Sequence, residues 1–206
     1  MSAGSVIELG MKKETVAMRD TDRRNEEEKG IFSILGGWIM YIVVIIGLTY
    51  LIITFVGQRT RVSGSSMETT LSDGDNLIVD KLSYHFTEPK RFDIIVFPYR
   101  HEENTYYIKR IIGLPGETIQ VIDGYVYINN ILLESDIYGA AVMDSPGIAA
   151  EPVVLGEDEY FVLGDNRNHS SDSRDPNVGI LKREDLIGRA WVRIFPFDRL
   201  GVIKHE

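Results

Sequence analysis

The sequence predicts a mainly β protein in which a single N-terminal transmembrane helix is followed by an all-β domain. Two observations lead to this fold class. Residues 31–56 contain no Asp, Glu, Lys or Arg over 26 positions. After residue 56 the chain consists of short runs rich in Val, Ile, Tyr and Phe, separated by turn residues and without the periodicity of an amphipathic helix.

The polar tail and the apolar segment come first along the chain. Residues 1–30 contain charge runs such as RR and EEEK, which are typical of a solvated, partly disordered tail. At about 1.5 Å per residue, the apolar segment 31–56 reaches about 39 Å and exceeds a hydrocarbon core of about 30 Å. A cleaved signal sequence has a shorter apolar region nearer the N-terminus, so this segment is expected to remain as a tilted anchor.

Basic residues on the two sides of the apolar segment predict its orientation. Six precede it and two follow it closely: Lys12, Lys13, Arg19, Arg23, Arg24 and Lys29, then Arg59 and Arg61. Flanks rich in Lys and Arg stay in the cytoplasm. We therefore expect a cytoplasmic N-terminus in the cell membrane and an extracytoplasmic domain over residues 57–206. The formal net charge of -9 argues against a nucleic-acid partner.

The β domain is predicted from seven runs of four to eight residues. They are NLIVD, DIIVF, YYIKRII, TIQVI, YVYIN, YFVLG and RAWVRIF. Asp123 and Gly124 between two alternating runs favour a hairpin with a type I′ turn, and Asn129 with Asn130 favours another turn. Residues 134–156 are rich in Ala, Gly, Pro and acidic residues, which indicates a surface connection rather than a second domain.

A candidate nucleophile lies in SGSSMETTL, residues 63–71. A serine nucleophile needs a base, and none of the four histidines stands in a recognisable catalytic setting. The chain has no cysteine, and it contains no metal-binding or phosphate-binding motif, so neither a metal nor a cofactor is expected.

A lysine can serve as the base if burial lowers its pKa from about 10.4 towards 7 or 8. In the run YYIKRII, Lys109 shares a strand face with Tyr107 and Ile111, and these neighbours would disfavour its charge. Each piece also has an ordinary structural reading. A strand lysine can extend to water, and a serine can cap a short helical turn. The segment GDNRNHSSDSR at 164–174 can simply form turns, since Gly, Asp, Asn and Ser are typical turn residues.

Three segments in this order, beyond an N-terminal anchor, resemble the type I signal peptidase family, the membrane-bound Ser/Lys proteases that remove signal peptides. SMETTL resembles the family's Ser-Met-x-Pro-Thr-Leu, and YIKRIIGLPG resembles Tyr-x-Lys-Arg-x-x-Gly-x-Pro-Gly. GDNRNHSSDSR resembles Gly-Asp-Asn-x-x-x-Ser-x-Asp-Ser-Arg. The similarity runs from about residue 36 to 203, and the short connection between the second and third segments resembles the compact, Gram-positive-type form.

The resemblance implies the role of each catalytic residue. Ser66 directly precedes the methionine and would be the nucleophile, while Ser65 occupies a variable site. Lys109 would be the general base, and the Ser66 backbone N–H would donate to the oxyanion. Some family members add a hydroxyl two residues before the nucleophile, which Gly64 cannot supply.

The third segment is expected to support this pair. Ser170 matches the family serine that hydrogen-bonds the lysine, and Asp172 and Arg174 match a family pair. We expect Arg110 to form an ion pair with Asp172. Further support for the loop and the substrate is expected from Met67, Gly164, Asp165 and Asn166.

Two residues depart from the family pattern. Thr69 stands where the family has Pro, which removes a fixed φ from the turn after the nucleophile. Phe92 stands where the family has Gly, so the backbone there is open to question. Neither is the nucleophile or the base.

The implied protein is a signal peptidase I, which cleaves after small residues of the Ala-x-Ala type through an acyl-enzyme. Its partners would be signal-peptide-bearing preproteins, the protein-export machinery and the lipid bilayer. Two alternatives remain: another Ser/Lys protease such as a self-cleaving repressor, which lacks an N-terminal span, and a catalytically silent, membrane-tethered β-module that binds exported chains.

Overall fold

The computed structural model describes residues 36–50, 57–139 and 141–205. The chain divides into two compact units, Met1–Leu51 and Ile52–Glu206. In the first unit, residues 36–50 form a helix. The polar tail predicted for residues 1–30 and the two ends of the predicted span, 31–35 and 51–56, lie outside the described residues. Among the described residues, no helix is both long and apolar enough to cross a membrane.

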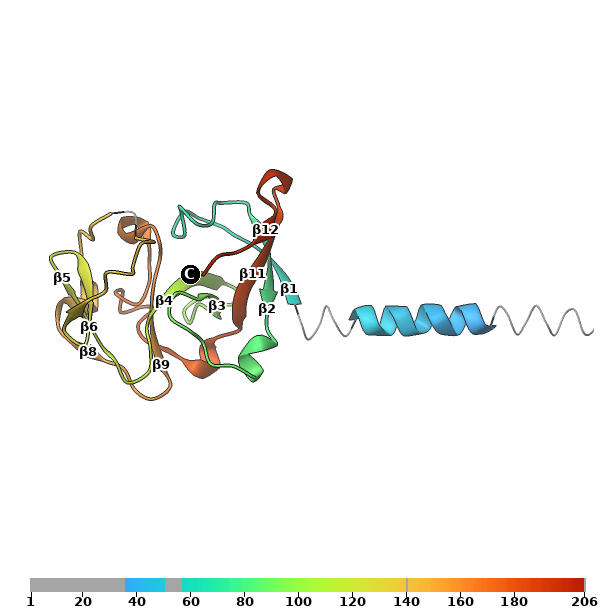
Figure 1. The fold of residues 1–206 in the computed structure, drawn as a ribbon, viewed down its shortest axis with the longest axis horizontal. Coiled ribbons are helices and arrows are strands. Elements are labelled where there is room, and N and C mark those ends of the chain that lie inside the picture. Colours follow the sequence, from blue (N-terminus) through green and yellow to red (C-terminus); the bar gives the residue numbers. More distant parts are fainter. Residues whose placement is uncertain (1–35, 51–56, 140, 206) are drawn as a thin grey trace, which may run out of the picture. The chain divides into compact units, whose positions relative to one another are not determined.

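Two antiparallel sheets build the second unit (Figure 1). The larger sheet has the order β1-β2-β11-β3-β4-β9-β10, with β12 paired to β11, and the smaller has the order β7-β6-β5-β8. The strands of the larger sheet are β1 (Gly57–Arg61), β2 (Asn76–Asp80), β3 (Ile94–Pro98), β4 (Tyr106–Gly113), β9 (Glu159–Leu163), β10 (Leu181–Lys182), β11 (Gly188–Phe195) and β12 (Gly201–Val202). Those of the smaller are β5 (Thr118–Ile122), β6 (Tyr125–Ile128), β7 (Ile131–Leu132) and β8 (Val153–Val154).

Short 3-10 helices connect several strands. They are η2 (Ser83–His85), η3 (Gly147–Ala150), η4 (Arg167–His169), η5 (Arg183–Asp185) and η6 (Phe197–Arg199). Figure 1 shows β5, β6 and β8 at one end of the β domain and β1, β2, β11 and β12 at the other. The mainly β fold class is therefore confirmed.

The predicted hairpin forms as expected between β5 and β6, with Ile122 opposite Tyr125. Asp123 and Gly124 have φ values of 52° and 79°, and positive φ at both central residues is the requirement of a type I′ turn. Asn129 and Asn130 also have positive φ and lead into β7.

The prediction of a surface connection over residues 134–156 is wrong in part. This segment contains η3 and β8, and β8 pairs with β5. Its Met143, Ala149 and Leu155 are buried in a core cluster. The sequence did not reveal these buried residues, because they are few and their spacing matches neither a strand nor a helix. The surrounding composition, rich in Ala, Gly and Pro, is typical of a surface loop.

Three buried clusters make the core, and strand alternation assigns their members. In β3, Ile94 and Val96 belong to the first cluster, whereas Ile95 and Phe97 belong to the third, because successive side chains point to opposite faces. The second cluster joins the smaller sheet to β4 and β9. β4 thus touches all three clusters, through Ile108, Ile112 and Ile111 respectively.

Candidate active site

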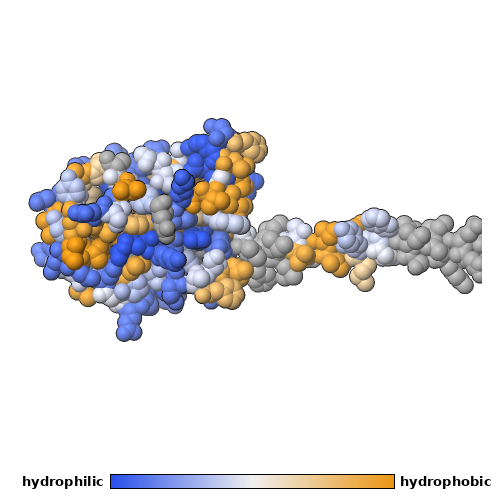
Figure 2. Space-filling view, viewed as in Figure 1, coloured by the Kyte–Doolittle hydropathy of each residue, from blue (hydrophilic) through white to orange (hydrophobic). Residues whose placement is uncertain are grey.

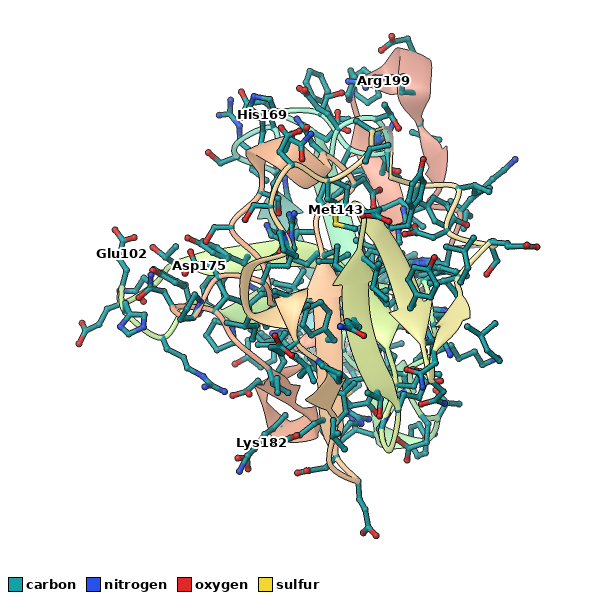
Figure 3. All side chains as sticks on the ribbon, turned by 90° about the vertical axis from the view of Figure 1, so that its left-hand side faces the viewer. Glu102, Met143, His169, Asp175, Lys182 and Arg199 are labelled. Carbon is teal, nitrogen blue, oxygen red and sulfur yellow. The ribbon has the colours of Figure 1, made fainter. Side chains whose placement is uncertain are left out.

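A cleft of about 290 Å³ lies between residues 60–67 and residues 106–109 of β4. Ser66 and Lys109 both line it, and so do His169 and Ser171 from the 164–174 loop. The side chain of His169 is labelled in Figure 3, where it projects from its loop. The two chain segments that carry the predicted nucleophile and base are therefore opposite walls of one cleft.

Ser66 and Lys109 are in direct contact. Lys109 Nζ lies 2.8 Å from Ser66 Oγ, and it also donates to the Ile108 carbonyl at 3.0 Å. Lys109 is only 4% exposed, and the pairing of β3 with β4 places it opposite Ile95. A serine hydroxyl next to an amine that can be neutral is the arrangement of a nucleophile with its base.

Burial lowers the pKa of Lys109 to about 8, although the carboxylates of Asp172 and Asp165 act in the opposite direction. Removing an ammonium group from water disfavours its charged form, and here this effect exceeds the attraction of the two carboxylates. At pH 7 about one tenth of the lysine is then neutral. The environment expected from the strand pattern is therefore present.

The turn that carries Ser66, residues 63–71, is called the serine turn below. It is anchored in the first core cluster by Met67 and Leu71, which are buried. Within it, Glu68 N donates to the Ser65 carbonyl, and Thr70 N and Leu71 N donate to the Met67 carbonyl. The Glu68–Thr69 peptide bond is cis. Among the described residues, no hydrogen bond occupies the Ser66 N–H.

The 164–174 loop holds the serine turn through its first residues. Asn166 N donates to the Ser66 carbonyl at 3.0 Å, and its side-chain amide donates to the Ser65 carbonyl at 3.2 Å. Gly164 lies so close that an added Cβ would be 2.2 Å from Ser170 Oγ and 2.5 Å from the Ser66 carbonyl oxygen. Only glycine fits here, because the obstacle includes a backbone atom.

Arg110 pairs with Asp165, and the expected ion pair with Asp172 is wrong. Arg110 donates to Asp165 through Nε at 2.8 Å and Nη2 at 2.7 Å, and both side chains are fully buried. The register of β4 with β9 explains the choice. Arg110 lies opposite Leu163, the last residue of β9, so Asp165 follows directly beside it.

Asp172 forms its hydrogen bonds within its own loop. It accepts from Arg174 Nε at 2.8 Å and Nη2 at 2.9 Å, and from the Gly164 backbone N–H at 3.0 Å. The Asp172–Arg174 pair of the third segment is therefore formed, and it fixes the shape of the loop rather than the serine turn.

Ser170 does not make the hydrogen bond to Lys109 that the resemblance implies. Its Oγ is buried and has no hydrogen-bond partner among the described residues, while Lys109 Nζ contacts Ser66 and the Ile108 carbonyl instead. The contact of Ser170 with Gly164 nevertheless keeps it beside the serine turn.

Phe92 takes the backbone conformation that suits the glycine of the family pattern. Its φ is 72°, a region that bulky residues rarely adopt. In this conformation its carbonyl accepts from Arg110 Nη1 at 2.9 Å and its N–H donates to the Ile111 carbonyl. The chain therefore keeps the local backbone geometry despite the substitution.

Residues 35–195 match the model of the family described as signal peptidase, peptidase S26. The chain belongs to the signal peptidase family. It is 38% identical over 194 residues to a probable signal peptidase I-2 of Synechocystis sp., covering 92% of this chain and 85% of that protein. It is 43% identical over 155 residues to a signal peptidase I of Leptolyngbya laminosa, covering 72% of this chain and 73% of that protein.

Two further relatives extend the comparison. A signal peptidase I T of Bacillus subtilis is 34% identical over 177 residues, which cover 81% of this chain and 89% of the relative. Among solved structures, a signal peptidase I of Enterococcus faecalis is 35% identical, with a TM-score of 0.42, and the match covers 50% of this chain and 97% of that one. The family resemblance stated from the three segments is confirmed.

Several residues around this signal peptidase site were not predicted. Thr70 Oγ1 donates to Asp165 at 2.6 Å and Arg193 donates to the Thr70 carbonyl. Thr70 stands inside the first segment, so its motif could have singled it out. Asp136 and Tyr138 contact buried arginines, and nothing in their sequence context signals it. Within 36–50, 57–139 and 141–205, no three His, Asp or Glu side chains are grouped for a metal ion.

Proposed function

We propose that this protein is a signal peptidase I, a membrane-anchored serine endopeptidase that removes signal peptides from exported preproteins after small residues. Ser66 is the nucleophile and Lys109 the general base. The observation that carries these roles is the 2.8 Å contact between Ser66 Oγ and the buried Lys109 Nζ in the cleft. Family membership and the signal peptidase I relatives support the activity.

Acylation begins with neutral Lys109. Its Nζ takes the proton of Ser66 Oγ while Oγ attacks the carbonyl carbon of the scissile peptide bond. The carbonyl oxygen becomes an oxyanion that accepts from the Ser66 N–H. The lysine ammonium then gives its proton to the leaving amine, the C–N bond breaks, and the signal peptide remains as an ester on Ser66.

Deacylation repeats the proton transfers with water. Neutral Lys109 takes a proton from water, the hydroxide attacks the ester, and the returning proton restores the Ser66 hydroxyl as the signal peptide leaves. The pKa of about 8 suits both steps, because a base works best when its pKa lies near the operating pH. The family resemblance also gives Ser170 a role in orienting Lys109, and its buried Oγ has no other hydrogen-bond partner among the described residues.

The substrate binds as an extended strand along β4. β4 pairs with β3 from Tyr106 to Arg110, but with β9 only from Arg110 to Gly113. Among the described residues, the edge of residues 106–109 that faces the cleft has no strand partner. A peptide can pair with such an edge through main-chain hydrogen bonds. The requirement for small side chains near the cleaved bond follows from the family resemblance.

The supporting residues have proposed roles as well. Asn166 and Gly164 hold the serine turn through the Ser66 carbonyl, and Met67 seats the turn in the core. Asp165 binds Arg110, and Asp172 with Arg174 shapes the loop.

We also propose the membrane arrangement: a cytoplasmic tail over 1–30, a transmembrane helix over 31–56 and an extracytoplasmic catalytic domain over 57–206. The charge asymmetry of the flanks supports it. The β11–β12 region also supports it, because it exposes apolar side chains that a bilayer surface can accept: Trp191, Phe195, Phe197, Leu200 and Val202. Figure 2 shows this hydrophobic surface in orange, and β11 is separated from β1 only by β2.

A covalent, serine-directed peptide inhibitor tests the catalytic proposal. The purified full-length protein in detergent should be labelled at Ser66, and it should cleave an Ala-x-Ala preprotein until labelling is complete. Labelling at another serine, or a well-folded protein that neither labels nor cleaves, would support the silent β-module instead.

Protease accessibility tests the topology. In intact protoplasts, added protease should digest the region after residue 57 and leave the first thirty residues intact, and inverted membrane vesicles should give the opposite result. Protection of the β domain in protoplasts would overturn the proposed orientation.

A further inference from the structure

Residues 136–139, in the connection that follows β7, lie against two buried arginines. Asp136 accepts from Arg167 Nη1 at 2.7 Å and Nη2 at 2.6 Å, and the two side chains are 8% and 4% exposed. The Tyr138 ring covers the guanidinium of Arg110, whose Cζ is 3.6 Å from the ring centroid. Gly139 is packed so closely that an added Cβ would lie 2.7 Å from Arg167 Cζ. We call this segment the arginine strap.

The two arginines form hydrogen bonds to neighbouring residues of the 164–174 loop. Arg167 Nε donates to the Gly164 carbonyl at 3.0 Å, and Arg110 donates to both carboxylate oxygens of Asp165. Gly164 in turn packs on the Ser66 carbonyl. Two residues, Arg167 and Gly164, therefore lie between the strap and the nucleophile along one route.

The second route reaches the other end of the serine turn. Asp165 accepts from Thr70 Oγ1 at 2.6 Å, and Arg110 Nη2 also donates to Thr70 Oγ1 at 3.2 Å. Ser66 and Thr70 are thus both held by residues that the two strap-bound arginines position. The turn has no strand pairing in the described residues. These contacts therefore act together with the bonds from Asn166 and Arg193 and with the buried Met67 and Leu71 to set its position.

Two further contacts hold the Tyr138 side chain, one through its hydroxyl and one through its ring. Its Oη donates to the His205 carbonyl at 3.1 Å, and its ring packs at 5.3 Å against Phe92. The carbonyl of Phe92 is itself an acceptor for Arg110 Nη1. The Tyr138 ring therefore covers the guanidinium, and the Phe92 carbonyl fixes its direction.

Anchoring of the connection does not require these contacts. Met143, a few residues further on and labelled in Figure 3, is buried in the second core cluster and ties the connection to the domain. A connection that served only to join β7 to β8 could remain solvated between its anchors. Here it instead supplies a bidentate carboxylate and a ring to two arginines that serve the site.

We propose that Asp136 and Tyr138 are positioning residues for catalysis: through Arg167 and Arg110 they hold Gly164 and Asp165, and thereby the serine turn, at the distance from Lys109 that the reaction needs. The inference rests on the proposed function. Neither residue contacts Ser66 or Lys109 directly, so any effect on catalysis has to pass through Arg167 and Arg110.

The test measures the first-order rate constant for labelling of full-length protein by a saturating serine-directed peptide inhibitor. Loss of folded protein lowers the labelled fraction, whereas displacement of Ser66 lowers the rate constant of the molecules that do label. Asp136→Asn should lower the rate constant about tenfold, because small misplacements of reacting groups are costly. Asp136→Glu should restore part of it, and the pH midpoint of labelling should stay near that of the parent.

Two comparisons complete the experiment. Glu134→Gln removes an exposed carboxylate of the same connection and should leave the rate constant unchanged. Tyr138→Leu should lower it more than Tyr138→Phe, which keeps the ring over Arg110. If the parent labels at Ser66 but Asp136→Asn and Tyr138→Leu label at the parent's rate constant, the strap proposal is wrong. If the parent itself fails to label, the proposed function fails.

Discussion

The two walls of the cleft are held in place by different kinds of contact. The wall that carries Lys109 is β4, a regular strand paired to β3 along residues 106–110 and to β9 beyond. The serine turn, which carries Ser66 on the other wall, has no strand pairing in the described residues. It depends on Met67 in the core and on side chains from three distant segments. These are Asn166 and Asp165 of the 164–174 loop, Arg110 of β4 and Arg193 of β11.

This difference separates two ways of encoding a site. Backbone pairing is available to almost every residue type, so the position of the base is specified by many weak, replaceable choices along β4. The position of the nucleophile depends on particular functional groups at particular atoms. Single substitutions at the distant residues that contact the serine turn should therefore disturb catalysis more than substitution of a half-exposed β4 side chain such as Tyr106.

The largest effect is expected from the two reacting groups themselves. Ser66→Ala and Lys109→Ala should each abolish cleavage of an Ala-x-Ala preprotein, a loss of about a thousandfold or more, because the pair acts as a unit. Ser65→Ala should keep most of the activity, since Ser65 contributes only its backbone carbonyl to the contacts of the turn. An inactive Ser65→Ala together with an active Ser66→Ala would reverse the assignment.

Asp165→Asn tests the wall that carries Ser66, which is held in place by side-chain contacts. It leaves the buried Arg110 without its counter-charge, and such a loss costs about 3–5 kcal/mol of folding free energy. Asparagine offers one acceptor oxygen where Arg110 Nε and Thr70 Oγ1 use two. We therefore expect kcat of the folded fraction to fall about a hundredfold, measured with active-site titration. The exposed pair Arg100–Asp185 is the control: Arg100→Gln should cost less than about 1 kcal/mol and leave kcat as it is.

Lys109→Met tests the burial of the base. A folded pKa of about 8 against about 10.4 in the unfolded chain penalises the folded state by about 3 kcal/mol below pH 8. Between these pKa values the unfolded chain binds more protons, so stability of the parent rises with pH there. The inactive Met variant should be more stable than the parent at pH 7, and its advantage should shrink towards pH 10.4. Urea unfolding of both proteins across this pH range measures the difference in their free energies of unfolding. A difference that does not change with pH would contradict the prediction.

The smallest effect on catalysis is expected from a substitution on β4, the wall that carries Lys109. Tyr106→Thr replaces a half-exposed side chain at the start of β4 with another residue that favours strands. The backbone pairing of Pro98 with residue 106 does not depend on the side chain. We expect kcat to change less than about threefold, and a loss as large as that of Asp165→Asn would show that the two walls are not encoded differently.

The sequence predicted those features that depend on local pattern. Alternating runs placed the strands, and an Asp-Gly pair gave the β5–β6 turn. Three segments indicated Ser66 and Lys109, which lie in contact in the structure. It did not predict contacts that depend on register. The choice of Asp165 over Asp172 as partner of Arg110 follows from where β9 ends against β4, which no single segment contains. The strap was missed because Asp136 and Tyr138 lie in a stretch whose composition is typical of surface loops.

The unpaired edge of β4 also matters for inhibition and resistance. A strand-like inhibitor that pairs with residues 106–109 would contact peptide N–H and C=O groups, which every amino acid except proline presents in the same way. A point mutation in this stretch changes side chains and leaves those groups in place. Resistance to such a compound would then have to arise by altered expression, by a bypassing enzyme, or by substitutions on the opposite wall, where changes also endanger the nucleophile.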